Sequence, residues 1–152
     1  MKPSPKRIRD WTKTPDGHAI FVDELNHRIL VEDGQGTLRV VSGEFRYPRS
    51  IAVLGPLAYV ADSWNHRVRA LNLPEWTLAF DFGPFFCPSS ITVVNGLLVV
   101  ADTNNCRLSF HRPDGSCELT YALNGFPQRV DVNDGGNLIV RYDDGDSETL
   151  NY

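Results

Sequence analysis

Histidine and cysteine recur at one position of a repeated polar turn, and both residue types are metal ligands. His27, His66 and Cys106 each follow an asparagine, and an aspartate stands four positions earlier in every copy. Imidazole, thiolate and carboxylate groups bind Zn²⁺, but each ligand atom must lie about 2 Å from the ion. The copies are 39 and 40 positions apart, from Asn26 to Asn65 and from Asn65 to Asn105. We expect such separate units to hold these side chains apart, and we therefore predict no metal and no cofactor.

The whole turn, Asp-x-x-Asn-x-Arg, repeats with its neighbours. Asp and Asn side chains hydrogen-bond turn backbone, and Arg forms strong pairs with carboxylates. A catalytic site needs only one copy of its residues, whereas a device that fastens each unit recurs in every unit. The predicted structural residues are Asp23, Asn26 and Arg28 in the first unit, Asp62, Asn65 and Arg67 in the second, and Asp102, Asn105 and Arg107 in the third.

The elements that position these turns have a β pattern. Each unit shows short apolar or alternating runs separated by turn residues, among them Asn95-Gly96 and Asp114-Gly115, which are strong hairpin signals. The sequence predicts a single domain, 1–152, with four-stranded antiparallel units at about 7–43, 44–83 and 84–124. A partial unit occupies 125–152, because the repeated pattern is lost beyond Tyr142. Four-stranded units of about 40 residues are typical of β-propeller blades.

The second unit resembles the NHL repeat. Val60-Ala61-Asp62-Ser63-Trp64-Asn65-His66-Arg67-Val68 carries the resemblance, preceded by Pro48-x-x-Ile51-Ala52-Val53, and the third unit follows the same pattern. The resemblance implies an all-β, propeller-like array, and members of this family typically form six-bladed rings that act as interaction platforms. Some bind RNA, and relatives in the wider propeller class are lactonases or amidating lyases.

Three complete units and a partial one are incomplete relative to a six-bladed ring, which would need about 240 residues at this period. Three explanations remain open. The chain is a piece of a longer propeller, it associates with itself or a similar chain to complete the ring, or it closes as a compact ring of four blades.

Composition narrows the classes of function. The formal net charge of −4 disfavours a nucleic-acid binder, because such proteins usually carry a strongly basic surface. No apolar run is long enough to span a membrane, and no apolar stretch follows the basic N-terminus as in a secretory signal. The three cysteines are an odd number without Cys-x-x-Cys spacing, which favours free thiols. We therefore expect a cytoplasmic protein that does not contact a membrane.

The turns between second and third strands and the connections between units should meet at one face. Arginine and exposed aromatic residues are enriched in binding hot spots. The predicted binding residues on this face are Arg46, Tyr47, Arg49, Trp64, His66, Phe86 and Arg129. No set of nucleophile, base and orienting group is visible, so no catalytic residue is predicted. The favoured function is a non-catalytic module for protein–protein interaction, with RNA binding or a propeller hydrolase or lyase as alternatives.

Overall fold

Four antiparallel sheets make up the computed structural model, which describes residues 8–152. The first three sheets have four strands each, and the fourth has three. The first sheet contains β1 (Asp10–Lys13), β2 (Ala19–Asp23), β3 (Arg28–Glu32) and β4 (Leu38–Val41); the second contains β5 (Pro48–Leu54), β6 (Leu57–Asp62), β7 (Arg67–Asn72) and β8 (Thr77–Phe82); the third contains β9 (Pro88–Val94), β10 (Leu97–Asp102), β11 (Arg107–His111) and β12 (Cys117–Ala122); the fourth contains β13 (Pro127–Val132), β14 (Leu138–Tyr142) and β15 (Ser147–Leu150).

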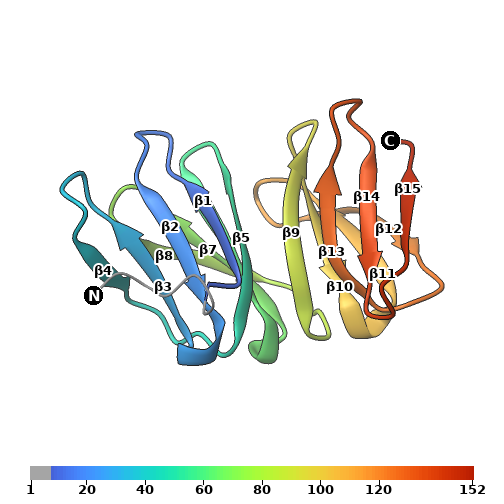
Figure 1. Ribbon diagram of the computed structural model, residues 1–152, viewed down its shortest axis with the longest axis horizontal. Helices are drawn as coiled ribbons and strands as arrows, with labels where there is room; N and C mark the ends of the chain where they lie inside the picture. The colour runs from blue at the N-terminus through green and yellow to red at the C-terminus, as the bar shows by residue number, and fades with distance from the viewer. Residues whose placement is uncertain (1–7) are drawn as a thin grey trace.

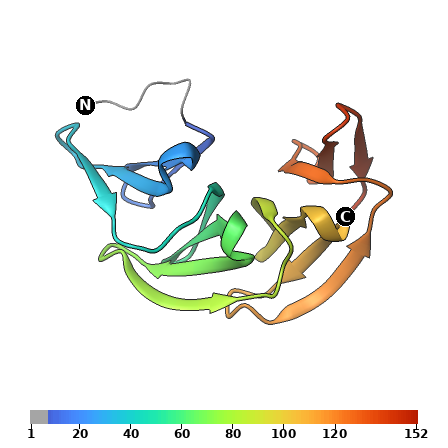
Figure 2. The same ribbon diagram turned by 90° about the horizontal axis from the view of Figure 1, so that it is seen from below.

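Each sheet is a meander in which strands pair in sequence order (Figure 1). A one-turn 3₁₀ helix joins the second and third strands of the first three sheets: η1 (Glu24–Asn26), η2 (Ser63–Asn65) and η3 (Thr103–Asn105). All three helical turns lie at the same end of the sheets, the lower edge of Figure 1. The sheets follow one another along an arc, and Figure 2 shows the arc open between the first sheet and the fourth. The all-β propeller arrangement predicted from the sequence is thus confirmed.

The core consists of three apolar layers, one between each pair of consecutive sheets. Ile20, Val22 and Ile29 of the first sheet pack against Val60 and Leu71 of the second. Corresponding layers join the second sheet to the third and the third to the fourth. Within residues 8–152, none of these buried layers joins the first sheet to the fourth. Each inner sheet is therefore buried on both faces, as in stacked repeats, whereas each end sheet is buried on one face.

Side chains of the innermost strands link neighbouring sheets at equivalent positions. Asp10 Oδ2 accepts a hydrogen bond from the backbone N–H of Ile51 at 3.1 Å. The Ser50 hydroxyl accepts the N–H of Ile91 at 3.0 Å, and the Ser90 hydroxyl accepts the N–H of Val130 at 3.1 Å. Each inner strand thus supplies one acceptor to the next. The sequence does not reveal these links, because the serine and its partner amide are 40 or 41 positions apart.

Replacing Ser90 with alanine should lower the free energy of unfolding by about 1–3 kcal/mol, the usual cost of a buried polar group left without its partner. The change removes the acceptor of the Val130 N–H in a buried hydrogen bond. Ser147→Ala is the matched control, because Ser147 lies exposed on β15 and should change stability by less than about 0.5 kcal/mol. Urea denaturation measures both, and equal effects would contradict a linking role for Ser90.

The structure also shows the state of the cysteines and the character of the helices. Cys87, Cys106 and Cys117 are all free thiols. In the part of the chain that the structure describes, no helix has the length and apolar character needed to cross a membrane.

Candidate functional site

The repeated polar turn is built from a 3₁₀ helix followed by one residue in the left-handed region. His27, His66 and Cys106 hold this position, with φ of 55°, 54° and 50°. The left-handed residue ends the helical turn and redirects the chain into the next strand. The position that looked like a metal ligand in the sequence is thus a special backbone position.

The aspartate of each turn is buried and collects several donors. Asp62 accepts the side-chain N–H of Asn65 at 2.9 Å and Arg67 Nε at 2.9 Å, and it also accepts the backbone N–H of Arg46 at 2.7 Å. Asp102 accepts the equivalent three hydrogen bonds, from the side chains of Asn105 and Arg107 and from the backbone N–H of Phe86. The turn therefore fastens the connection that enters its own sheet.

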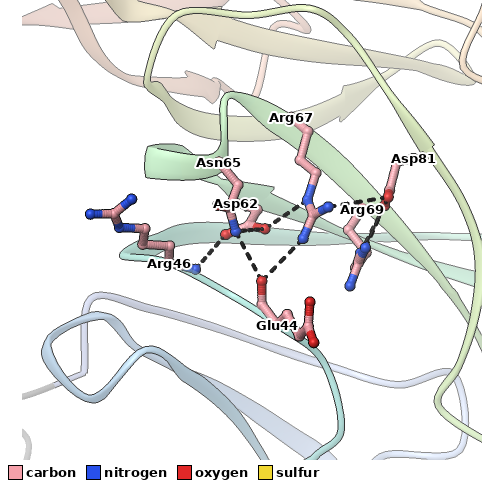
Figure 3. A network of polar contacts seen from close by, with 7 residues as sticks. All are labelled: Glu44, Arg46, Asp62, Asn65, Arg67, Arg69 and Asp81. Carbon is pink, nitrogen blue, oxygen red and sulfur yellow. Dashed lines mark hydrogen bonds and ion pairs between the residues drawn. The ribbon is translucent and has the colours of Figure 1, made fainter.

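Figure 3 shows how this network extends around the second turn. The backbone carbonyl of Glu44 accepts hydrogen bonds from Asn65 Nδ2 at 2.9 Å and from an Arg67 terminal nitrogen at 3.0 Å. Arg69 Nε lies 2.8 Å from Asp81, and its guanidinium holds the pKa of that carboxyl below its usual value. The arginines bind carboxylates and backbone within the protein, which is the geometry of a structural fastening.

Two of the histidines serve the joints between sheets. His27 Nδ1 accepts the backbone N–H of Tyr47 at 2.9 Å, and His66 Nδ1 accepts that of Cys87 at 3.1 Å. Each imidazole thus accepts, through Nδ1, a backbone hydrogen bond from the connection that leads to the next sheet. Among residues 8–152 there is no group of three His, Cys, Asp or Glu side chains arranged to hold a metal ion.

Aromatic residues gather at the end of the strands where the helical turns and the connections between sheets lie. We call this side of the molecule the loop face. Trp64 is 45% exposed on η2, with its ring 4.6 Å from that of Tyr47 between centroids. The Arg46 guanidinium carbon lies 5.6 Å from the Trp64 ring centroid, within the range of a cation–π contact. Tyr47 in turn contacts the His27 ring edge-on at 4.2 Å. We call Arg46, Tyr47, Trp64 and His27 the Trp64 cluster.

The next joint repeats this arrangement with different residues. Phe86 is 49% exposed, and its ring stacks on His66 with centroids 5.3 Å apart. The backbone N–H of Trp64 donates to the Arg46 carbonyl, and that of Asn104 donates to the Phe86 carbonyl, both within 3.1 Å. The loop face therefore presents an exposed aromatic side chain beside each of two successive joints, on a backbone fixed by hydrogen bonds.

Two predicted binding residues lie elsewhere. Arg49 Nε contacts Glu24 at 3.1 Å, and Arg129 Nε contacts Asp131 at 3.1 Å. Both line a polar crevice of about 170 Å³ beside the innermost strands. The structure thus groups Arg46, Tyr47 and Trp64 together, pairs His66 with Phe86, and separates Arg49 and Arg129 from them.

Sequence reasoning missed Leu25, which is 66% exposed in the first helical turn. It occupies the same place in its turn as Trp64 does in η2. Alignment of the repeats could have found it, because Leu25 aligns with Trp64 and Asn104 at the middle of the turn.

The comparisons with known proteins agree on the fold. The NHL repeat family model matches residues 85–109, which contain the third helical turn. The chain therefore carries an NHL repeat on a β-propeller fold. No curated protein matches it significantly in sequence.

Among solved structures, Kuenenia stuttgartiensis hydrazine synthase is similar with a TM-score of 0.78 and 16% identity, over 94% of this chain and 44% of that one. Virginiamycin B lyase from Staphylococcus aureus is similar with a TM-score of 0.77 and 14% identity, over 97% of this chain and 57% of that one. A streptogramin B lyase gives 0.75 and 14%, over 98% and 56%. The chain spans about half the length of these structures, and identities this low show the fold alone.

Proposed function

We propose that the chain is a non-catalytic protein-interaction module that presents its loop face to a protein partner. The observation that supports this most is the Trp64 cluster, in which a half-exposed tryptophan is braced by Tyr47 and Arg46. Tryptophan, tyrosine and arginine dominate binding hot spots. A ring held in place by its neighbours loses little freedom on binding, which favours affinity.

We further propose that the four sheets are an incomplete propeller, with three complete blades and one partial blade, short of a six-bladed ring. The chain covers only 44–57% of the length of the similar solved chains, which supports this view. The open arc in Figure 2 supports it too.

The alternatives have less support. RNA binding would need free basic side chains, but Arg49, Arg69 and Arg129 each lie against a carboxylate, which neutralises most of the charge that phosphates would need. The similarity to lyases supports a shared fold, and because one fold hosts many functions it is no argument for lyase activity in this chain. A cytoplasmic location remains our expectation.

The test is capture of binding partners from cell extract with the wild-type chain, followed by titration of a recovered protein against variants. Trp64→Ala should weaken binding by at least 2 kcal/mol, or about thirtyfold. Leu119→Ala is the matched control, because Leu119 is 44% exposed on the outermost strand of the third sheet and pairs with Phe110, toward the end of the sheet opposite the helical turns. A partner that binds the Trp64 variant as tightly as the wild type would overturn the proposal. A nucleic-acid partner with steep salt dependence would favour the RNA alternative.

A further inference from the structure

A cavity of about 400 Å³ lies between the first and second sheets, at the end of the strands opposite the loop face. Four hairpins contribute to its lining: β1–β2 and β3–β4 of the first sheet, and β5–β6 and β7–β8 of the second. Their turns lie along the upper edge of Figure 1. Sites for small molecules usually have volumes of about 300–1,000 Å³ and occur where structural units meet. None of the binding residues predicted on the loop face lines this cavity.

The first joint lacks the tyrosine that crosses the second one. Between the second and third sheets, Tyr59 is fully buried, and its hydroxyl donates to the Pro113 carbonyl in the β11–β12 turn at 2.7 Å. Ile20 holds the same position in β2, three residues before the aspartate of the polar turn. Isoleucine is shorter than tyrosine and has no hydroxyl, so it cannot form this bridge. The cavity lies in the joint where the bridge is absent.

The least exposed part of the lining is apolar. Trp76 is 6% exposed and Val31 is 4% exposed, and Leu73 packs against the same layer. Trp76 has a φ of 63°, and its backbone N–H donates to the Asn72 carbonyl at 2.7 Å. A bulky residue in the left-handed region is uncommon, and such positions gather at functional sites. This wall is suited to packing against a large apolar group of a ligand.

The rest of the lining carries charges of both signs on one hairpin. Arg39 is paired in register with Val31, so its side chain lies on the face that is directed toward the second sheet. Asp33 comes two positions after Val31, and its backbone N–H donates to the Thr37 carbonyl, which continues the pairing. Asp33 and Arg39 are therefore diagonal neighbours about 7–8 Å apart. Neither side chain forms an ion pair with another residue in the range 8–152.

Hydrogen bonds keep the carboxylates of the cavity ionised. Asp33 Oδ1 accepts the backbone N–H groups of Thr37 at 2.9 Å and Gln35 at 2.8 Å, and these bonds hold the pKa of Asp33 below its usual value. A side-chain hydrogen bond from the β1–β2 turn lowers the pKa of Asp16 in the same direction. At neutral pH the cavity thus offers two carboxylates and one guanidinium. A ligand that carries both an amine and a carboxylate is complementary to this set.

We propose that the cavity binds a free α-amino acid with a large apolar side chain. The ammonium group pairs with Asp33 and Asp16, the carboxylate pairs with Arg39, and the apolar side chain packs against Trp76. An amino acid carries its two charges on one carbon, which matches the placement of Asp33 and Arg39 on one hairpin. The loop face lies at the other end of the strands, so this site and the protein-binding function stand or fall independently.

Isothermal titration calorimetry with L-phenylalanine tests the site, and we expect a dissociation constant of about 1 mM or lower. 2-Phenylethylamine lacks the carboxylate and 3-phenylpropionate lacks the amine, so each should bind about tenfold more weakly, as when a hydrogen bond to a charged group is lost. Glycine, which has no apolar side chain, should not bind measurably. The proposal is overturned if L-phenylalanine, L-leucine and L-tryptophan all fail to bind, or if either analogue binds as tightly as L-phenylalanine.

Two variants test the assigned charges. Arg39→Gln should weaken L-phenylalanine about tenfold and leave 2-phenylethylamine unchanged, because that ligand has no carboxylate. Asp33→Asn should weaken both ligands but not 3-phenylpropionate, and the asparagine oxygen still accepts the two N–H groups that hold the turn.

The matched controls lie outside the cavity and should bind as the wild type does. Asp114→Asn changes the aspartate that accepts the Ser116 N–H in the equivalent turn of the third sheet. Arg141→Gln removes an arginine of the fourth sheet whose side chain is 55% exposed. Circular dichroism should show unchanged strand content in all four variants. Equal weakening by Asp33→Asn and Asp114→Asn, or an Arg39→Gln variant that weakens both ligands alike, rejects the site.

Discussion

Replacing Asp62 with alanine is expected to lower the free energy of unfolding by about 3–5 kcal/mol, the range found when one partner of a buried ion pair is removed. Asp62 is fully buried and accepts hydrogen bonds from Arg67, Asn65 and the backbone N–H of Arg46. Alanine leaves all three donors without this acceptor. The Arg67 guanidinium is also only partly exposed, so water compensates for the lost carboxylate only in part.

Chemical denaturation monitored by tryptophan fluorescence measures this loss. Asp131→Ala is the control, because Asp131 also pairs with arginines but is 35% exposed, and surface pairs contribute less than about 1 kcal/mol. Asp62→Asn should lie between the wild type and Asp62→Ala, since the amide keeps one acceptor oxygen. If Asp62→Ala and Asp131→Ala cost the same, the turn is not the fastening that its geometry indicates.

The repeat made the fold predictable, because spacing and alternation are local properties of the sequence. Asp62, Asn65 and Arg67 lie within six positions and contact one another, so their grouping could be predicted from the turn alone. The bond from the Arg46 N–H to Asp62 spans 16 positions and could not, because it depends on where the connection between sheets runs. The sequence also does not reveal the left-handed conformation of His66, because histidine, unlike glycine, does not indicate a positive φ.

The candidate site was predictable only in part. Trp64 stood out because it varies within a repeated turn, and the structure brings Arg46 and Tyr47 to it. Arg49 and Arg129 lie close in sequence to connections between sheets, yet both line the polar crevice and pair with carboxylates, Arg49 with Glu24 and Arg129 with Asp131. The direction of a side chain at the start of a strand depends on the register with the next strand. That register cannot be predicted from composition and spacing.

Replacing Tyr59 with alanine is the second change for which we expect a large effect, about 3–5 kcal/mol, as for other large aromatic residues removed from a core. Tyr59 is fully buried in the layer between the second and third sheets, and its ring meets that of Phe82 edge-on at 6.4 Å. Its hydroxyl donates to the Pro113 carbonyl at 2.7 Å, across to the turn before β12. Burial also raises the pKa of this hydroxyl, which keeps it a donor.

Tyr59→Phe separates the two contributions, because it removes only the hydrogen bond and should cost about 1 kcal/mol. The difference between the two variants is then the packing of the ring, which holds consecutive sheets together in an arc whose first and last described sheets share no buried apolar layer. Tyr121→Ala, on an exposed strand, should change stability by less than about 0.5 kcal/mol. Thermal and urea unfolding give all three values. A Tyr59→Phe loss as large as that of Tyr59→Ala would mean that the bond to Pro113, rather than the apolar layer, joins the second sheet to the third.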